Sequence, residues 1–422
     1  MKKNYFDIAV IGGGPAGMMA AGRAAEMGAK VVLIEKNNSP GKKLLLTGKG
    51  RCNITNYITD NRHFIDAFGS RGKFFHSPLN KFGVEETIRF FNEQKLDTVV
   101  ERGNRVFPEM GGAKGVLNVL KNYARKNKVK FLFNTAVKEF INEESHVAGL
   151  KLIGSEVFAH AFILCTGGLS YPRTGSTGDG YNWVERMGHS IIPLQPALVP
   201  IKLEASYSKE LNRLILKNVS VGIYHGDKKI DQRFGEASFT NDGMDGPVIL
   251  DMSKKMGEHK EKSLQLKIDL KPALDYKKLD MRIRRDLEIS GNSELKNSLF
   301  KLLPKKIVPV IIKMSKIKTS KKASTITREE RKRLLNLIKE FPFQIKGICG
   351  YERAIVTSGG ISLDEIYPKT MKSKLVDNLF FAGEIVDLDG PTGGFNLQVC
   401  WSTGYVAGEE ASKFITSRSV SG

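Results

Sequence analysis

The residues of this sequence with the clearest chemical meaning lie in a glycine-rich turn near its start. The stretch GGGPAG at residues 12–17 has the spacing G-x-G-x-x-G and follows an apolar run at 5–11. Small residues continue through 18–27, a second apolar run follows at 30–34, and Glu35 comes directly after it. This order predicts strand, turn, helix, strand and acid, which is typical of a dinucleotide-binding unit.

The physical roles in such a unit differ from position to position. Gly12 allows the tight turn, Gly14 lets the backbone approach a pyrophosphate, and Gly17 lets the helix pack closely on the strand. The helix N-terminus presents N–H donors to the phosphates, and Glu35 would accept hydrogen bonds from ribose hydroxyls. The predicted phosphate-binding residues are Gly12, Gly14, Pro15, Ala16 and Gly17.

Two later segments indicate that the dinucleotide carries a flavin. The run NLFFAGE at 378–384 predicts a strand that ends in a glycine and an acid, and a helix of small and apolar residues is predicted at 393–411. A helix N-terminus stabilises the anionic end of a reduced flavin, and the acid can hold the ribityl chain. The run FILCTGG at 162–168 breaks into glycines where a chain would pass close to a bound nucleotide.

Four long motifs carry a more specific resemblance, namely KKLLLTGKGRCNITN (42–56), GLSYPRTGSTGDGY (168–181), FTNDGMDGPVILDMS (239–253) and AGEIVDLDGPTGGFNLQVCWSTGYVAG (382–408). With the first turn, they resemble the two-dinucleotide-binding-domain flavoproteins, and most closely the BaiN/RdsA-type (YhiN-like) FAD-dependent oxidoreductases. The resemblance covers the chain end to end and implies FAD as cofactor, with NAD(P)H as reductant. Asn241 stands where that family usually has His, so a proton-donor role for that His does not carry over.

The resemblance also assigns residues to the cofactor site. Arg51 is expected to neutralise a reduced, anionic isoalloxazine, and Asn53 to hydrogen-bond the ring edge. Cys52 is the candidate catalytic proton donor, with a packed structural thiol as the alternative. Asp387 and its neighbour Asp389 would hold the ribityl chain or cap a helix. The cofactor residues beyond the first turn are Glu35, Lys36, Lys43, Arg51, Cys52, Asn53, Val137, Thr166, Gly167, Gly383, Glu384, Asp387, Gly394, Asn396 and Leu397.

Cysteine usage and hydropathy bear on compartment and metals. The four cysteines are widely spaced and form no C-x-x-C pair, which argues against a disulfide scaffold or a metal site and fits a reducing compartment. The first 22 residues imitate a signal peptide, but three glycines and Pro15 interrupt the apolar core. No stretch approaches the ~20 apolar residues that span a bilayer. We expect a soluble cytoplasmic protein without stable membrane association; no residue pattern indicates an oligomeric state.

The 422 residues are more than one core usually supports. We predict an α/β fold whose Rossmann-like FAD-binding domain is split between residues 1–192 and 345–422. The insertion reads as a β-rich domain at 193–270, with a hairpin signal at Gly226-Asp227, and a basic helical domain at 271–344.

Charge is concentrated in the helical part of the insertion. The chain carries a net charge of +21, and residues 271–340 contain 20 Lys or Arg against 8 Asp or Glu, with no acid between Lys301 and Thr327. A solvated helix face usually interleaves acids. General solubility is one alternative. A membrane-surface helix is another, but the apolar residues of 308–317 keep no helical period, and Pro309 interrupts them. We favour binding of RNA phosphates through Lys305, Lys306, Lys313, Lys316, Lys318, Lys321 and Lys322.

The resemblance includes enzymes that reduce uridine in ribosomal RNA to dihydrouridine, and the basic domain fits such a substrate. Hydride would add at C6 of uracil while an acid protonates C5, and the base would have to leave the stack. A reductase or oxidase of a small molecule such as an unsaturated steroid is the second hypothesis. A flavin-bearing RNA-binding factor without redox turnover is the third.

Overall fold

The structure, a computed structural model, describes residues 4–143, 145–204, 207–259 and 263–419. The chain folds into two compact units. Met1–Pro196 and Ile355–Gly422 together form the first, which we call the cofactor unit, and Ala197–Ala354 form the second, the inserted unit. The predicted α/β fold with a Rossmann-like sheet is confirmed.

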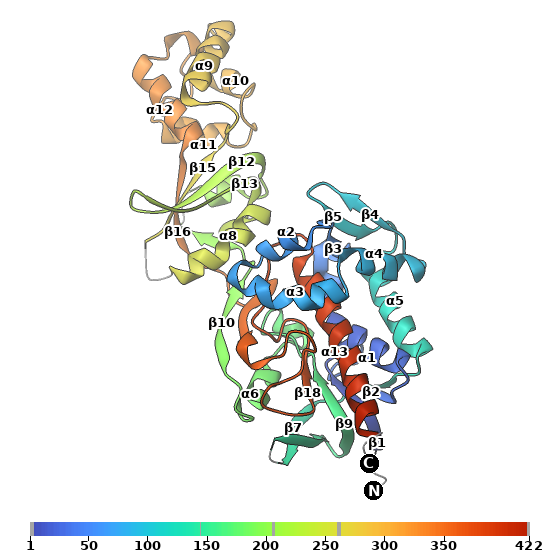
Figure 1. Cartoon of the computed structure of the whole chain (residues 1–422). Helices are drawn as coiled ribbons and strands as arrows, with labels where there is room; N and C mark the ends of the chain where they lie inside the picture. The colour runs from blue at the N-terminus through green and yellow to red at the C-terminus, as the bar shows by residue number, and fades with distance from the viewer. Residues whose placement is uncertain (1–3, 144, 205–206, 260–262, 420–422) are drawn as a thin grey trace. The chain divides into compact units, whose positions relative to one another are not determined.

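The cofactor unit is built on a sheet with the strand order β6-β2-β1-β9-β8-β7, and β18 pairs with β9 at its side (Figure 1). Its parallel strands are β1 (Asn4–Ile11), β2 (Val31–Ile34), β6 (Lys130–Leu132), β9 (Glu156–Leu164) and β18 (Leu379–Phe381). Leu164 of β9 is in register with Ile11 of β1 and with Phe381 of β18. Three strands from distant parts of the chain therefore end at one edge, where the predicted glycine-rich turns follow them.

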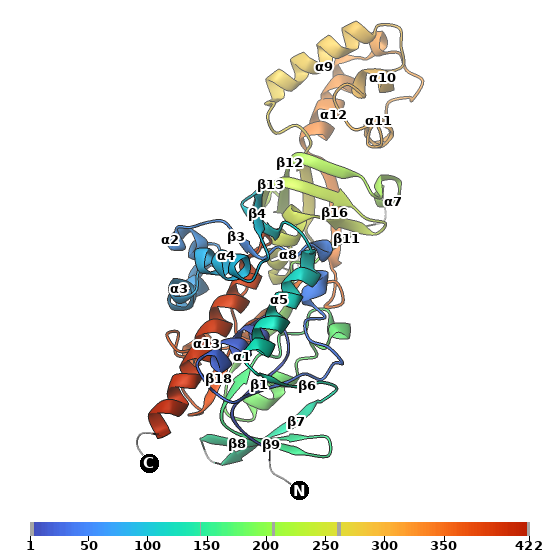
Figure 2. The ribbon, with the colours of Figure 1, turned by 90° about the vertical axis from the view of Figure 1, so that its right-hand side faces the viewer.

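Helix packing on this sheet depends on small residues. α1 (Pro15–Glu26) contacts α13 (Phe395–Ser419), the C-terminal helix that Figure 2 shows beside it. A side chain at Gly404 or Gly408 would place its Cβ within 2.5 Å of a backbone oxygen of α1. The two helices can approach this closely only because both positions are glycine.

Further elements surround the sheet. β7 (Val137–Glu143) and β8 (His146–Leu152) extend it with antiparallel pairing, and β10 (Ile191–Ala197) pairs with β17 (Val356–Ile361). A small antiparallel sheet has the order β3-β5-β4, with β3 (Thr55–Asn56), β5 (Arg105–Pro108) and β4 (Thr98–Glu101). The other helical segments are η1 (Leu44–Gly50), α2 (Asn61–Asp66), η2 (Gly69–Arg71), α3 (Gly72–Lys81), α4 (Val84–Glu93), α5 (Gly112–Lys126), η3 (Pro172–Thr174), α6 (Asp179–Glu185) and η5 (Leu363–Glu365).

The inserted unit contains a closed barrel with the strand order β11-β14-β13-β12-β15-β16. The strands are β11 (Ile201–Leu203), β12 (Ile215–His225), β13 (Lys228–Phe239), β14 (Gly243–Asp245), β15 (Gln265–Asp269) and β16 (Phe341–Ile348), and the unit also contains α7 (Ser208–Leu211) and α8 (Pro247–Glu258). His225 pairs with Lys228, so the predicted hairpin at Gly226-Asp227 is confirmed.

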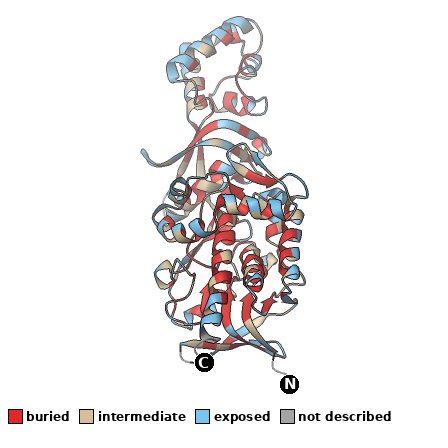
Figure 3. Cartoon of the chain, turned by 45° about the vertical axis from the view of Figure 1, so that its right-hand side comes forward, coloured by how far each residue is buried: buried red, intermediate tan, exposed pale blue. Residues whose placement is uncertain are grey.

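Helices follow β15, as the sequence predicts. They are α9 (Tyr276–Ser290), α10 (Leu295–Leu299), α11 (Val308–Met314), η4 (Ala323–Thr325) and α12 (Arg328–Lys339). Asp275 caps α9 by accepting from the Lys278 backbone N–H at 2.7 Å, and Thr327 with Glu330 forms a capping box on α12. Exposed residues line the outer faces of these helices in Figure 3.

The apolar residues of α11 and the turn after it are in the protein core. Val308, Ile311, Ile312 and Ile317 are each at most 5% exposed and belong to a cluster that also contains barrel residues such as Phe341. Their side chains are therefore already buried within the inserted unit, which argues against the membrane-surface alternative. No helix in the described ranges is long and apolar enough to cross a membrane.

The unit boundaries differ from those predicted. The insertion begins at Ala197 and ends at Ala354, whereas the sequence-based boundaries lie at 192/193 and 344/345. The end moves because β16 completes the barrel: Phe341 pairs with Ile268 of β15, and Ile348 pairs with Ile201 of β11. Since the helices share the barrel's core, the structure joins the β-rich and helical parts in one unit.

Candidate active site

The glycine-rich turn joins β1 to α1, and of its three motif glycines only Gly14 has open space beside it. A Cβ at Gly12, whose φ is +103°, would lie 2.5 Å from the Cys165 carbonyl oxygen, and one at Gly17 would lie 1.9 Å from the Gly12 oxygen. At Gly14, by contrast, a Cβ would meet nothing within 4 Å. Gly14 is the N-cap of α1 and has no side chain to cap the helix, and Pro15 at the first position has no N–H, so the first free donors of the helix begin with Ala16. The turn can receive an anion there.

Glu35 lies at the end of β2 and is 8% exposed. One carboxylate oxygen accepts from the Gly13 N–H at 2.8 Å, and the other accepts from the N–H and the side-chain amide of Asn37. These bonds fix the carboxylate against the glycine-rich turn. The acid and the turn, predicted to act on one dinucleotide, are thus in direct contact.

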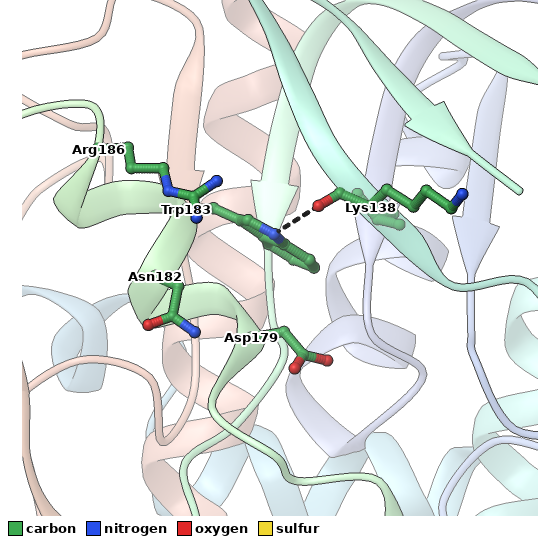
Figure 4. A pocket seen from close by; sticks show the side chains of 6 residues that line it. Lys138, Asp179, Asn182, Trp183 and Arg186 are labelled. Atoms are coloured by element: carbon green, nitrogen blue, oxygen red, sulfur yellow. Dashed lines mark hydrogen bonds between the residues drawn. The ribbon is translucent and has the colours of Figure 1, made fainter.

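A pocket lies between the start of β7 and helix α6 (Figure 4). It is lined by Val137, Lys138, Asp179, Asn182, Trp183 and Arg186. The Trp183 indole N–H donates to the Lys138 carbonyl at 3.0 Å, and Asp179 forms an ion pair with Lys36 at 2.7 Å. Two residues that the sequence assigned to the cofactor are therefore found at this pocket. Val137 lines it, and Lys36 forms an ion pair with Asp179, which also lines it.

Glu384 follows β18 and gathers donors from three other segments. One oxygen accepts from the Thr357 N–H at 2.8 Å and the Ser170 hydroxyl at 2.7 Å, and the other accepts from Lys43 at 2.5 Å. The preceding residue, Gly383, has φ of +79°, and a side chain on it would press on Ala16. Three sequence-assigned residues, Lys43, Gly383 and Glu384, therefore meet beside the start of α1.

Asp387 and Asp389 share one guanidinium. Arg71, at the end of η2, pairs with Asp387 and lies 2.9 Å from an Asp389 oxygen, while the Ser358 hydroxyl donates to the same Asp389 oxygen at 2.8 Å. Both aspartates are less than 10% exposed. The cation compensates for burying two carboxylates, and it ties the loop after β18 to the segment between α2 and α3.

The loop before α13 is shaped by Asn396. Its amide donates to the Gly390 carbonyl at 2.8 Å, and its amide oxygen accepts from the Gly390 N–H at 2.9 Å. The side chain therefore shapes its own loop, and its contact with the cofactor stays a prediction. Gly394 lies against the Thr55 backbone, where a Cβ would approach within 2.4 Å, and Leu397 follows, partly buried, in the first turn of α13.

The loop containing Arg51, Cys52 and Asn53 follows η1. Arg51 pairs with Glu101 and lies 4.2 Å from the Phe107 ring centroid, with its side chain 56% exposed. The guanidinium therefore has a carboxylate partner on β4, and its predicted role against a flavin stays a prediction. Asn53 is half-buried, and its Oδ1 has no hydrogen-bond partner within the described part of the chain.

Cys52 is fully buried with φ of +61°. Burial raises the pKa of its thiol to about 12, so the thiol is protonated at neutral pH. This fits a packed thiol and also meets one requirement of a proton donor. The described cysteines are all buried and free, and burial also raises the pKa of Cys165.

Three buried polar atoms in this region point to an absent ligand. Asn53 Oδ1, Asn56 Oδ1 and Thr166 Oγ1 have no hydrogen-bond partner among the described residues. Such atoms are rare in a folded interior. Thr166 follows β9 and lies next to Gly12, while Asn56 is the last residue of β3 and lies next to Gly393. Asn53 comes two residues before β3. Together with the open space at Gly14, these atoms fit an extended group with many hydrogen-bonding atoms, such as FAD.

The lysines assigned to RNA are not equivalent. Lys305, Lys316, Lys318 and Lys322 are exposed, and none of them forms an ion pair within the described part of the chain. Lys306 donates to the Asn212 carbonyl, and Lys313 lies 3.7 Å from Glu210 and 5.2 Å from the Tyr207 ring centroid.

Lys321 departs from the expectation of a free cation. It is only partly exposed and donates to both oxygens of Glu330 at 2.7 Å. Sequence reasoning missed this pair because the two residues lie on different segments: Lys321 precedes η4, and Glu330 is in the first turn of α12.

The structure adds residues that sequence reasoning missed. Arg71, Ser170, Thr357 and Asn56 complete the polar contacts described above. Ser170 lies inside the GLSYPR motif, which was a usable signal. Arg71 stands among ordinary polar residues, and only the fold brings it to Asp387.

Solved structures show which class of fold this is. A 3-ketosteroid delta1-dehydrogenase from Sterolibacterium denitrificans superposes with a TM-score of 0.56 at 13% identity, covering 98% of this chain and 100% of that chain. A flavocytochrome c3 fumarate reductase gives a TM-score of 0.53 at 16% identity, and the match covers 98% of this chain and 79% of that chain. At these identities the likeness shows the fold alone. The fold is that of FAD-binding flavoproteins.

Comparisons of sequence narrow this class. The model of the HI0933-like protein Rossmann domain matches residues 6–410, so the chain belongs to the HI0933-like family, as its motifs predicted. The 3-dehydro-bile acid delta(4,6)-reductase of Clostridium scindens is 30% identical over 411 residues, 96% of this chain and 99% of that protein. The ribosomal RNA dihydrouridine synthase of Escherichia coli is 28% identical over 414 residues, which are 96% of this chain and 98% of that protein. The protein is a flavoprotein oxidoreductase.

Proposed function

We propose that this protein uses FAD, reduced by NAD(P)H, to saturate the C5=C6 bond of uridine in ribosomal RNA. The exposed lysines of the helical part of the inserted unit carry this choice of substrate. Lys305, Lys316, Lys318 and Lys322 have no acidic partner among the described residues, and no acid lies between residues 301 and 327. Unneutralised lysines give affinity for a phosphate backbone regardless of its sequence.

Full-length relatives support the same substrate. Proteins of Escherichia coli and Haemophilus influenzae with the printed name ribosomal RNA dihydrouridine synthase are each 28% identical to this chain over at least 96% of its length. A ribosomal RNA substrate would place the protein in the cytoplasm, where ribosomes are.

The chain's own residues would hold the cofactor in three places. The turn with Gly12, Gly14 and Gly17 would bind the pyrophosphate, with Pro15 and Ala16 opening the helix behind it. Glu35, Lys36 and Val137 would surround the adenosine end. The ribityl chain and ring would lie near Glu384 and Asp387, along the unpartnered Asn53 and Thr166. When bound, FAD would supply the hydride that adds to C6 of uracil, while the protein must deliver a proton to C5.

Cys52 is the candidate for that proton. Its raised pKa keeps the thiol protonated at neutral pH. If it is the donor, Cys52→Ala should lower kcat at least 100-fold while leaving flavin content unchanged. Cys52→Ser, which retains a proton on oxygen, should recover part of the rate. If both variants turn over within a few-fold of the natural protein, the thiol is only packed.

A small-molecule substrate is the second candidate. It is favoured by the 30% identity to the Clostridium scindens bile acid reductase over nearly the whole of both chains. The same flavin site would then reduce a C=C bond conjugated to a carbonyl in a steroid-like molecule.

One experiment separates the two. Ribosomal RNA from a strain without the gene, and from the same strain complemented with it, is digested and its dihydrouridine measured by mass spectrometry. In parallel, NAD(P)H oxidation by the purified protein is followed with unmodified ribosomal RNA or with a 3-oxo-Δ4 steroid. The proposal requires dihydrouridine that depends on the gene, and oxidation stimulated by RNA. Stimulation by the steroid alone favours the second candidate; flavin that stays oxidised under excess NAD(P)H favours a non-catalytic RNA-binding factor.

A further inference from the structure

The excess positive charge of this chain is confined to two segments. Residues 271–340 hold 20 Lys or Arg and 8 Asp or Glu, and residues 42–130 hold 18 and 8. All other residues together hold 28 and 29, which leaves them nearly neutral. The first segment belongs to the inserted unit, but 42–130 belongs to the cofactor unit. The cofactor unit therefore has a basic region of its own, which the proposed function does not use.

Part of this region is a compact surface on the small sheet β3-β5-β4. Arg102 lies in the turn between β4 and β5, Arg105 is the first residue of β5, and Tyr57 follows β3 beside this turn. The Arg105 side chain donates to the Arg102 carbonyl at 3.0 Å, and the Tyr57 N–H donates to the Asn104 carbonyl at 2.6 Å. Arg102 is exposed and Tyr57 is 46% exposed. We call Tyr57, Arg102 and Arg105 the hairpin surface.

The hairpin surface is connected to the candidate active site through one side chain. The Asn56 amide donates to the Gly103 carbonyl in the hairpin turn at 3.3 Å and to the Gly393 carbonyl at 3.1 Å. Gly393 lies in the glycine-rich loop before α13, next to Gly394, which packs on Thr55. One buried residue thus separates the exposed turn from the loop assigned to the flavin end of the cofactor. In Figure 1 this hairpin and β7 lie at opposite ends of the cofactor unit.

We propose that the hairpin surface binds single-stranded RNA next to the reacting base, with Tyr57 stacking on a neighbouring base and Arg102 and Arg105 holding the flanking phosphates. The proposal rests on the proposed function. An exposed aromatic ring with cations on a neighbouring turn is the arrangement that binds unstacked nucleotides, whereas lysines alone suit a phosphate backbone. Tyr57 is 46% exposed and forms no aromatic pair with any other described residue, so no described ring competes with a base for it.

The two basic segments would then divide the recognition of RNA. The lysines of the inserted unit would give affinity for any RNA, and the hairpin surface would hold a base that has left its stack. A target uridine must leave the stack to be reduced, and a platform for its neighbour stabilises that opened state. The hairpin surface should therefore distinguish single-stranded from double-stranded RNA, which the inserted unit should not do.

The test uses the full-length protein and two labelled probes, a short oligouridine and an RNA duplex. Tyr57→Ala should weaken binding of oligouridine about tenfold, while Tyr57→Phe keeps most of the affinity because the ring is retained. Arg102→Gln with Arg105→Gln should lower the slope of log affinity against log salt by about 1.4 for the single strand. Binding of the duplex should change less than twofold for Tyr57→Ala.

A matched control removes the same charge elsewhere in the segment. Arg125→Gln with Lys128→Gln alters two exposed cations, one in the last turn of α5 and one just after it, at the end that Figure 2 shows leading to β6. This variant should bind oligouridine almost as the natural protein does. Flavin absorbance and circular dichroism verify that every variant is folded and loaded.

The outcomes separate this inference from the proposed function. If the natural protein ignores oligouridine, or if Tyr57→Ala and the control bind it equally well, the hairpin surface is not an RNA site. If dihydrouridine appears in ribosomal RNA and Tyr57→Ala forms it at the natural rate, the inference fails and the proposed function stands. If Tyr57→Ala loses oligouridine but no dihydrouridine depends on the gene, the proposed function fails and the RNA surface stands.

Discussion

In the cofactor unit the decisive charged groups are buried or partly buried carboxylates, while in the inserted unit they are exposed lysines. Glu384 takes donors from Thr357, Ser170 and Lys43, each within 2.8 Å. Lys316 and Lys318, in contrast, extend from a segment whose apolar residues are buried, and they have no ion-pair partner in the described ranges.

This difference implies different responses to mutation. A buried carboxylate depends on partners from several segments, so losing one contact affects fold and cofactor together. An exposed lysine acts through the summed field of its neighbours, so losing one changes affinity by a small increment. Substitutions should therefore have large, coupled effects in the cofactor unit and small, additive effects in the inserted unit.

The largest effect is expected from Gly17→Ala. Its new Cβ would lie 1.9 Å from the Gly12 oxygen, so α1 must shift away from β1 and stability should fall by about 3 kcal/mol. Gly14→Ala is the matched variant, because φ is −75° and nothing lies within 4 Å. It should fold normally but retain much less flavin. Thermal unfolding measures the loss of stability, and the flavin-to-protein absorbance ratio measures the loss of flavin. If both variants lose flavin equally without any loss of stability, the predicted difference between Gly17 and Gly14 is wrong.

Glu409→Gln should come next, with a distinctive pH dependence. Burial alone would raise the pKa of Glu409, but hydrogen bonds from Lys81, Lys413 and Arg23 lower it to about 2. Because the folded pKa lies below the ordinary 4.5, the stabilisation is fully present above pH 4.5 and is lost as the pH falls toward 2. The variant should lose roughly 3 kcal/mol at neutral pH and nothing near pH 2. Urea unfolding across this range tests it; a pH-independent loss would argue for packing alone.

A smaller effect is expected from Glu384→Gln. The amide keeps the size of the side chain but loses the ion pair with Lys43, so flavin should bind roughly tenfold more weakly while the fold survives. Dissociation of flavin followed by fluorescence gives the affinity. Lys151→Gln, which removes an exposed ion pair with Glu139 in the same unit, serves as the control and should change nothing.

The smallest effects belong to single lysines of the inserted unit. Lys316→Gln should weaken binding of an RNA duplex two- to fivefold at low salt, and combining it with Lys318→Gln should multiply the two losses. Lys321→Gln should cost less, because Glu330 already neutralises this lysine. Fluorescence anisotropy measures all three. An equal loss for Lys321 and Lys316 would show that the ion pair opens on binding.

Local patterns predicted the supporting elements well. The strand at β1, the helix after residues 12–17 and the hairpin at Gly226-Asp227 are each specified by a few neighbouring residues, through glycine conformations and alternating or continuous apolar runs. The end of the insertion was missed because β16 is a barrel strand only by virtue of its pairing with β11 and β15. No residue pattern within 341–348 indicates that this strand pairs with β11 and β15.

The sequence alone determined where a dinucleotide turn forms and where positive charge collects, because both depend on residue types that lie close together in the chain. Tertiary structure decided which cations are neutralised by an acidic partner and which carboxylates are held by a cation. Arg51 is paired with Glu101, Lys321 with Glu330, and Arg71 with Asp387. Each pair joins segments whose contact depends on how the sheets and helices pack, and the energy of a charge depends on its nearest partner and its burial.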